Sequence, residues 1–319
     1  MRIAILDDYQ NLALKLADWS ALQQRCDVVV FDRHLSEEEA VIALQDFDAI
    51  CLLRERMAVP RTLIERLPRL KWIAITGGKN RTLDMAAATE RGIVVSAAPR
   101  GEAGGYATPE LAWGLMIALA RKIPQETLEM RNGGWQHTFG TALGGRTLGV
   151  VGLGRLGRHM VPIARAFGME VIAWSQNLTP EAASAAGAMY VTKDELFSRS
   201  DFISLHLVLS ERTRHIVGRR ELDLMKKSAY LVNTARGPLI DTPALIDVLQ
   251  ARGIAGAGLD TFDVEPLPAD HPLRNLDNVL LTPHLGYTVE DLLRAFYEGT
   301  VENVTGFVDG APLRVVRTE

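Results

Sequence analysis

The chain has 319 residues, of which 47% are hydrophobic and 23% are charged, as in soluble globular proteins. It is too long for one ordinary hydrophobic core, so two domains are expected. A formal net charge of −4 and a pI near 6.0 disfavour a nucleic-acid-binding surface. The apolar run Leu111 to Ala120 is far shorter than a membrane span, so no membrane partner is expected.

Cysteine usage bears on the compartment. Cys26 and Cys51 lie in apolar, strand-like surroundings. We expect buried, reduced thiols rather than a disulfide, which favours a cytoplasmic location. Because the chain contains no CxxC or HExxH motif, no metal site is expected.

Strand-like and helix-like segments alternate almost from end to end, which predicts mostly parallel sheets with helices on both faces. The first part of the chain contains five predicted strands: Arg2–Leu6, Val28–Phe31, Ala49–Leu53, Trp72–Ile75 and Ile93–Val95. Between them, Ser36 before three glutamates predicts a capping box. Pro60 suits the first turn of another helix, and Asp84 can cap a helix that ends at Gly92.

A long apolar helix is predicted from Tyr106 to about Arg121, followed by a loop at residues 132–135. The second part of the chain contains further predicted strands at Leu148–Val151, Glu170–Trp174, Phe202–Leu205, Tyr230–Val232, Gly256–Leu259 and Val279–Leu281. Thr288 is expected to open a final amphipathic helix that reaches about Val308. The sequence thus indicates two α/β units.

The most informative motif is a glycine-rich turn between a predicted strand and a predicted helix. Gly152 permits a tight turn, Gly154 lets the backbone approach a pyrophosphate, and Gly157 lets the helix pack closely on the strand. The helix begins near Arg155, where its N–H groups and positive dipole end would face the phosphates. Because strand, turn, helix and a second strand follow in order, the motif predicts a dinucleotide site. The first unit lacks such a motif.

Three later segments place polar residues at predicted strand ends, where open α/β sheets bind ligands. Arg236 follows one strand, and it is either a solvated surface residue or a planar fork for a carboxylate. Asp260 ends the next strand, and Pro266 favours an extended Glu265. His284 follows the last strand; a single histidine of this kind is more often structural than catalytic.

Taken together, these residues supply what the reduction of a 2-keto acid needs beside a nicotinamide. Arg236 would bind the substrate carboxylate, and His284 would give a proton to the forming alkoxide. Glu265 would orient His284 and stabilise its imidazolium. The cofactor would supply the hydride.

The chain resembles the D-isomer-specific 2-hydroxyacid dehydrogenase family, which includes D-3-phosphoglycerate, glyoxylate and hydroxypyruvate enzymes. The residues that carry the resemblance are Gly145–Gly149, the Gly152–Gly157 motif, Met225–Lys226, Val232–Gly237, Gly258–Asp260, Glu265–Leu267, Asn278–Val279 and Thr282–His284. The resemblance implies two doubly wound parallel-sheet domains. A Rossmann cofactor domain (102–287) is inserted into a discontinuous flavodoxin-like substrate domain (1–101 and 288–319).

The resemblance also implies an NAD(P)-dependent D-2-hydroxyacid dehydrogenase with the catalytic residues Arg236, Glu265 and His284. Asp260 would reach the nicotinamide carboxamide. The implied cofactor-binding residues are Gly152, Gly154, Arg155, Leu156, Gly157, Ser175, Gln176, Asn177, His206, Thr213, Thr234, Asp260 and Gly286. Residues from about 102 to 145 resemble the arm through which family members dimerise, so a homodimer is expected.

Two departures from the family pattern concern specificity. Family members specific for NAD carry an acidic residue where Ser175 stands, so NADP becomes admissible, although no arginine stands beside Ser175 in the sequence. The cofactor is therefore NAD or NADP. The family's substrate loop corresponds to Gly77, Gly78 and Lys79; Lys79 replaces a glycine and is either solvated or a cation for a second acidic group on the substrate. Arg54 matches a family arginine that faces the substrate.

Two other functions compete with this one. Some proteins that resemble the family are corepressors, dimeric modules that sense NAD(H) without significant turnover. The presence of both Glu265 and His284 argues against pure sensing, because a sensor does not need that pair. Formate dehydrogenase is disfavoured because that branch carries Gln at the position of Glu265.

Overall fold

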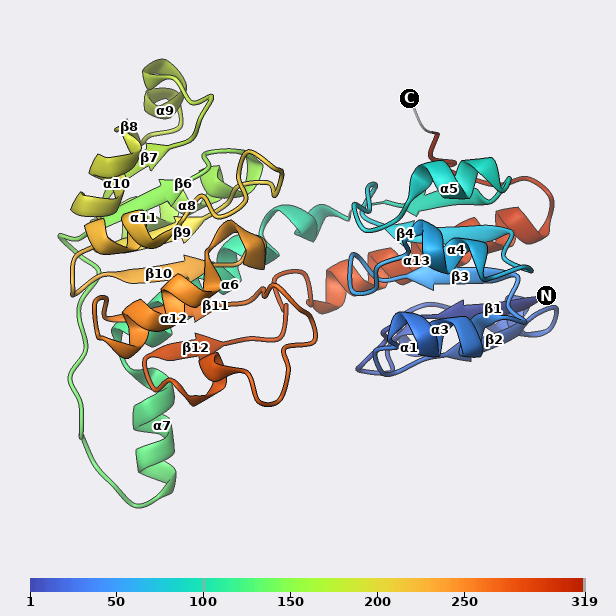
Figure 1. The fold of residues 1–319 in the computed structure, drawn as a ribbon, viewed down its shortest axis with the longest axis horizontal. Coiled ribbons are helices and arrows are strands. Elements are labelled where there is room, and N and C mark those ends of the chain that lie inside the picture. The colour runs from blue at the N-terminus through green and yellow to red at the C-terminus, as the bar shows by residue number, and fades with distance from the viewer. Residues whose placement is uncertain (100, 318–319) are drawn as a thin grey trace. The chain divides into compact units, whose positions relative to one another are not determined.

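A computed structural model describes residues 1–99 and 101–317. The chain divides into two compact units, Met1–Gly104 with Val289–Glu319, and Gly105–Thr288. Each unit is an α/β structure built on one parallel sheet (Figure 1). The predicted fold class of two doubly wound parallel-sheet domains is therefore confirmed.

The first unit has a five-stranded sheet in the order β2-β1-β3-β4-β5, the flavodoxin-like order, with every pairing parallel. Its strands are β1 Arg2–Ile5, β2 Asp27–Val30, β3 Ala49–Leu52, β4 Trp72–Thr76 and β5 Val94–Ala98. Its helices are α1 Ala13–Leu16, α2 Ser20–Gln23, α3 Glu37–Leu44, α4 Arg61–Glu65, α5 Met85–Glu90 and α13 Glu290–Val308, with a 3₁₀ turn at Glu102–Gly105.

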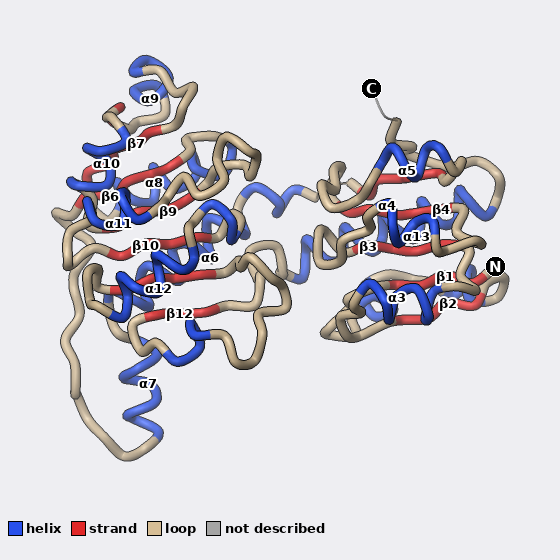
Figure 2. Tube along the Cα trace, viewed as in Figure 1, coloured by secondary structure: helices blue, strands red, loops and turns tan. Residues whose placement is uncertain are grey.

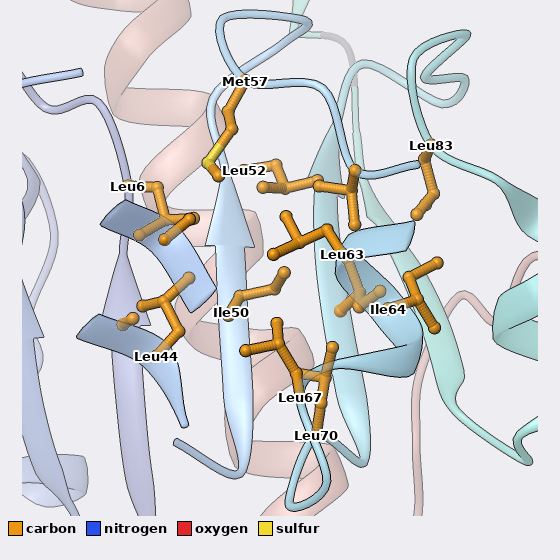
Figure 3. Packing of buried hydrophobic residues seen from close by; sticks show 14 of the residues in the cluster. Leu6, Leu44, Ile50, Leu52, Met57, Leu63, Ile64, Leu67, Leu70 and Leu83 are labelled. Carbon is orange, nitrogen blue, oxygen red and sulfur yellow. The ribbon is translucent and has the colours of Figure 1, made fainter. Parts of the chain in front are cut away.

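Helices cover both faces of this sheet. Leucine and isoleucine side chains of α3, α4 and the sheet form one core, with Ile50 and Leu63 fully buried (Figure 3). On the other face, α13 packs against β4 and β5, and the Phe307 ring stacks on Trp72 at 5.6 Å. The C-terminal helix therefore completes the unit that the N-terminus begins.

The helix starts follow from their capping residues. Ser36 forms the predicted capping box, and Asp84 accepts a hydrogen bond from the first turn of α5, which confirms both predictions. Pro60 lies at the N-cap position of α4, one residue before the predicted place. The last helix has Val289 at its N-cap position, one residue after the predicted Thr288, and no side chain caps it.

The second unit has a seven-stranded parallel sheet in the order β12-β11-β10-β9-β6-β7-β8. Its strands are β6 Thr147–Val151, β7 Glu170–Trp174, β8 Met189–Tyr190, β9 Phe202–Leu205, β10 Tyr230–Asn233, β11 Gly256–Leu259 and β12 Val279–Leu281. Its helices are α6 Ala107–Ala120, α7 Ile123–Arg131, α8 Arg155–Ala166, α9 Pro180–Ala185, α10 Lys193–Arg199, α11 Arg219–Leu224 and α12 Thr242–Gln250, with 3₁₀ turns at Gly237–Leu239 and Pro272–Asn275.

The second sheet is also covered on both faces. Val150 joins a core with α6 and α8, whereas its neighbour Val151 joins a core with α10, α11 and α12. Adjacent strand residues point to opposite faces, so both must be apolar in a doubly wound sheet. Strand β6 lies between β9 and β7, where the strand order reverses. In sheets of this kind ligands usually bind at the carboxyl ends of the strands at this point.

Helix α7 and the loop after it form an arm at the edge of the second unit (Figure 1), and the loop returns from α7 to β6 (Figure 2). The sequence prediction did not separate α7 from the surrounding loop. No residue of α7 is buried, so the helix does not pack an apolar face into the core of the unit. The large apolar residues exposed on this arm are Ile123, Leu128, Met130, Trp135 and Phe139.

Both cysteines are buried and unpaired, as predicted. Burial raises the pKa of the Cys51 thiol. Among the residues that the structure describes, no helix is long and apolar enough to cross a membrane.

Candidate active site

The glycine-rich turn follows β6, and close contacts explain two of its three glycines. Gly152 has φ +98°, and a Cβ there would lie 2.9 Å from the His206 carbonyl carbon. A Cβ at Gly157 would clash with the Gly152 carbonyl oxygen, so this glycine lets α8 pack against the turn. A Cβ at Gly154 would meet no atom within 4 Å. The turn therefore has open space at Gly154, at the N-terminus of α8.

The loop after β7 contains the predicted ribose-binding residues. Ser175 is half-buried at the strand end, and Gln176 and Asn177 are exposed. The Gln176 side-chain amide donates a hydrogen bond to the Arg212 carbonyl oxygen at 3.2 Å. An arginine therefore adjoins this loop in space, although none stands beside Ser175 in the sequence.

The loop after β9 contains His206 and Thr213. Burial lowers the pKa of His206 to about 4, so the ring is neutral near pH 7; its Nε2 lies 2.9 Å from Ser204 Oγ. The Thr213 hydroxyl accepts from the Ser210 N–H at 2.8 Å and donates to the Val208 carbonyl at 2.7 Å. Thr213 therefore holds the shape of the loop.

Arg236 follows β10 in a turn that is held by a buried side chain. The Asn233 amide donates to the Arg236 carbonyl oxygen at 2.9 Å, and its oxygen accepts from the Ala235 N–H at 3.0 Å. The next residue, Gly237, packs directly on the backbone after β11: a Cβ there would lie 2.5 Å from the Asp263 nitrogen and closer still to the Phe262 carbonyl. This close packing places the half-buried Arg236 beside the segment that leads to Glu265.

Glu265 and His284 form a tight pair. Glu265 Oε2 lies 2.5 Å from His284 Nδ1, and Glu265 Oε1 accepts from the Phe262 N–H at 2.8 Å. The side chains are 26% and 17% exposed, so the pair is partly shielded from water. His284 has φ +54°, and the Tyr287 ring contacts its imidazole edge-to-face at 5.3 Å. The Phe262 N–H therefore helps to hold the Glu265 carboxylate, and the Tyr287 ring packs against the His284 imidazole.

The buried carboxylate of Asp260 holds the loop that bears His284. It accepts hydrogen bonds from the Thr282 hydroxyl at 2.6 Å, the Leu285 N–H at 2.7 Å and the Gly286 N–H at 2.9 Å. Burial raises the pKa of Asp260, while these hydrogen bonds and the nearby His284 oppose the rise. Because Asp260 is fully buried, its direct contact with a nicotinamide stays a prediction.

The predicted substrate residues of the first unit gather at the carboxyl ends of β3 and β4. Arg54 donates from its backbone to the Thr76 hydroxyl at 2.8 Å and from Nη1 to the Thr76 carbonyl at 2.9 Å. Gly77 and Gly78 have φ +79° and +85°, and a Cβ at Gly77 would lie 2.9 Å from the Arg54 guanidinium carbon. Lys79 is exposed on this loop. Arg54 therefore lies against the backbone of the loop.

Within the second unit, the three predicted catalytic residues follow three adjacent parallel strands, β10, β11 and β12. A series of contacts connects them. The turn at Arg236 packs on Phe262, the Phe262 N–H donates to Glu265, and Glu265 contacts His284. Sequence reasoning missed the packing role of Gly237 and the loop-holding role of Asp260. Neither leaves a sequence signal beyond its residue type, because each depends on a close contact with another strand end.

A family model for the NAD-binding domain of D-isomer-specific 2-hydroxyacid dehydrogenases matches residues 113–286. The chain belongs to this family. It is therefore an oxidoreductase that uses a nicotinamide cofactor.

Three relatives illustrate the dehydrogenase family. D-3-phosphoglycerate dehydrogenase of Methanocaldococcus jannaschii is 43% identical over 264 residues, which cover 82% of this chain but only 50% of that protein. Glyoxylate reductase of Thermococcus litoralis is 40% identical over 261 residues, 79% of this chain and 78% of that protein. A solved phosphoglycerate oxidoreductase from Vibrio cholerae O395 superposes with a TM-score of 0.91 at 35% identity, over 98% of this chain and 100% of that one.

The residues of this dehydrogenase fit a nicotinamide dinucleotide. The space at Gly154 lies at a helix N-terminus, where free backbone N–H groups and the helix dipole favour a pyrophosphate. Thr234 follows β10, and its buried hydroxyl has no hydrogen-bond partner among the described residues. A buried polar atom normally has a partner, so Thr234 offers a hydrogen bond to a ligand.

Proposed function

We propose that this protein reduces 2-keto acids to D-2-hydroxy acids and catalyses the reverse oxidation, with NAD(H) or NADP(H) as the second substrate. The observation that carries the proposal is the 2.5 Å contact between Glu265 and His284, at strand ends adjoining Arg236. The family membership supports the reaction class, and the glyoxylate reductase relative supports small 2-keto acids as substrates.

The proposed roles follow from the geometry. A carboxylate can only accept a hydrogen bond, so Glu265 fixes the proton of His284 on Nδ1 and leaves Nε2 for the reacting oxygen. His284 then gives a proton to the alkoxide during reduction and takes it back during oxidation. Glu265 stabilises the imidazolium, and the planar Arg236 guanidinium binds the substrate carboxylate through two hydrogen bonds. The bound dinucleotide supplies or accepts the hydride.

Cofactor binding is proposed for the loops that follow β6, β7, β9 and β10. Gly154, Arg155, Leu156 and Gly157 would hold the pyrophosphate at the N-terminus of α8. Thr234 would hydrogen-bond the nicotinamide half through its unpartnered hydroxyl. Arg54 and the Gly77–Lys79 loop of the first unit stay predicted substrate contacts.

We also propose that the protein is a homodimer whose interface includes the arm formed by α7 and the following loop. Trp135 is 71% exposed and Phe139 is 93% exposed on this arm. A soluble protein rarely leaves several large apolar side chains together in water unless another surface covers them. A second copy of the chain fits, because the family resemblance places dimerisation in the same segment.

A matrix of 2-keto acids against NADH and NADPH tests the proposed activity. Purified protein should consume reduced dinucleotide with glyoxylate, hydroxypyruvate or a related acid, measured by the nicotinamide absorbance. Replacing His284 by Ala should lower the rate by about two to four orders of magnitude while the dinucleotide still binds, as expected for a lost general acid. Glu265→Gln should lose less, because an amide oxygen can still orient the ring.

Two outcomes would contradict the proposal. Absence of turnover across a broad panel with both dinucleotides would refute the enzyme. Dimerisation that depends on NAD(H), without turnover, would instead favour the sensing module. Full activity in His284→Ala would remove that residue from the mechanism.

A further inference from the structure

The contacts of the second unit bring three loops together at the carboxyl end of β6. The Gly152 N–H donates to the Trp174 carbonyl at 2.9 Å, which ties the glycine-rich turn to the end of β7. The His206 N–H donates to the Val151 carbonyl at 2.8 Å, which ties the loop after β9 to β6. The Gln176 amide then links the β7 loop to the β9 loop through the Arg212 carbonyl, at 3.2 Å.

The charges on these loops are unusual for an NAD site. The ribose loop, Ser175 to Asn177, carries no carboxylate, only a hydroxyl and two amides. The facing loop carries Arg212 and Arg214 with a single carboxylate, Glu211. Among residues 1–99 and 101–317, no hydrogen bond or ion pair engages either guanidinium. Both arginines are exposed.

Such an arrangement suits a phosphate ester better than a free hydroxyl. A dinucleotide site selects NAD with a carboxylate that accepts from the ribose 2′-hydroxyl, and it accommodates NADP with a nearby arginine. A carboxylate would repel a 2′-phosphate, whereas a guanidinium binds it with charge-assisted hydrogen bonds. Ser175 stands where the family's acid would be, and Arg212 adjoins it through the Gln176 contact.

We infer that Arg212, together with Ser175 and Gln176, binds the 2′-phosphate of NADP(H), and that this protein prefers NADP(H) to NAD(H). The inference rests on the proposed function, because it assumes that the adenosine half of a dinucleotide lies over these loops. It assigns cofactor preference to an arginine from the loop after β9, at 37 positions beyond Ser175 in the sequence.

The test measures binding without turnover. Dissociation constants of 2′,5′-ADP and 5′-AMP, and of NADPH and NADH, are measured by calorimetry on the full chain with no keto acid present. The wild type should bind the 2′-phosphorylated member of each pair at least about tenfold more tightly, since a charge-assisted hydrogen bond contributes a factor of this order. Raising the salt concentration should reduce that ratio, because the guanidinium is exposed.

Three variants sharpen the test. Arg212→Gln should reduce the preference ratio about tenfold or more, while Arg131→Gln, which removes an exposed arginine from α7, should leave the ratio unchanged. Ser175→Asp should reverse the preference in favour of NADH and 5′-AMP.

Equal binding of the two members of each pair, or a ratio that Arg212→Gln leaves unchanged, would overturn the inference. Keto acid reduction with NADH would still support the proposed function in that case. Conversely, a strong 2′-phosphate preference that depends on Arg212, without turnover on any keto acid, would support the inference and contradict the enzyme.

Discussion

The substitution Gly237→Ala tests whether backbone packing positions Arg236. The added Cβ would lie 2.5 Å from the Asp263 nitrogen and closer still to the Phe262 carbonyl, whereas ordinary contacts begin at 3.4 Å, so the two segments must separate by more than 0.9 Å. Overpacking of this kind costs about 1–3 kcal/mol. In a domain of this size, such a loss of stability lowers Tm by roughly 2–12 °C.

The larger effect should be on activity. A misplacement of about 1 Å at a positioning residue can cost about a hundredfold in rate. We therefore expect kcat/KM for the keto acid to fall by about two orders of magnitude in Gly237→Ala, with KM rising as the guanidinium loses its alignment. The assays are steady-state kinetics at saturating dinucleotide and thermal unfolding followed by circular dichroism.

Gly114→Ala provides a matched control. A Cβ at Gly114, inside α6, would meet no atom within 4 Å, so this variant should keep its activity and gain up to about 1 kcal/mol in stability. If Gly237→Ala matched this control in both activity and Tm, the packing argument would be wrong. A loss of Tm with unchanged kcat/KM would show that Gly237 stabilises the unit without aligning Arg236.

The remaining predictions concern acid stability and assembly. Burial lowers the pKa of His206 from 6.5 to about 4. Between these two pH values the histidine is protonated in the unfolded chain but neutral in the native protein. The free energy of unfolding should therefore fall by up to about 3 kcal/mol as pH drops from 6.5 to 4. Urea unfolding across this range should show a smaller fall in His206→Gln, which keeps a partner for Ser204 but cannot titrate; parallel curves would contradict the prediction. On the arm, replacing both Trp135 and Phe139 by Ser should shift the mass measured by light scattering from dimer to monomer, whereas Tyr190→Ser, elsewhere on the unit, should not; an unchanged dimer would exclude this part of the arm from the interface.

The local structure could be predicted from the sequence where a residue acts on its near neighbours in the chain. The capping residues Ser36 and Asp84 act on N–H groups three positions away, so their effect is visible in the sequence itself. The strands of both sheets likewise appear as short apolar runs, except β8, an exposed strand of two residues that the sequence prediction missed. Helix α7 was missed; none of its residues is buried, so it lacks the core-facing apolar side whose period identifies most helices.

The candidate site was predictable in its residue types but not in its contacts. The motif residues Arg236, Glu265 and His284 were identifiable, and the Glu265–His284 contact agrees with the roles predicted for them. The neighbourhood of Ser175 was not predictable, because Arg212 lies in the loop after β9, and β9 and β7 flank β6 on opposite sides. Adjacency across a parallel sheet depends on strand order, which the order of segments along the chain does not reveal.

The strand order of the second unit also separates the residues proposed to select the cofactor from the residues proposed to act on the substrate. Three strand spacings lie between β7, which precedes Ser175, and β10, which precedes Arg236; five lie between β7 and β12, which precedes His284. At about 4.8 Å per spacing these separations are roughly 14 and 24 Å. Sites so far apart usually contribute additively to free energy. Substitutions near Ser175 could therefore change the preference between NADP(H) and NAD(H) in the course of evolution. Proton transfer by His284, on the other side of the sheet, would not be affected.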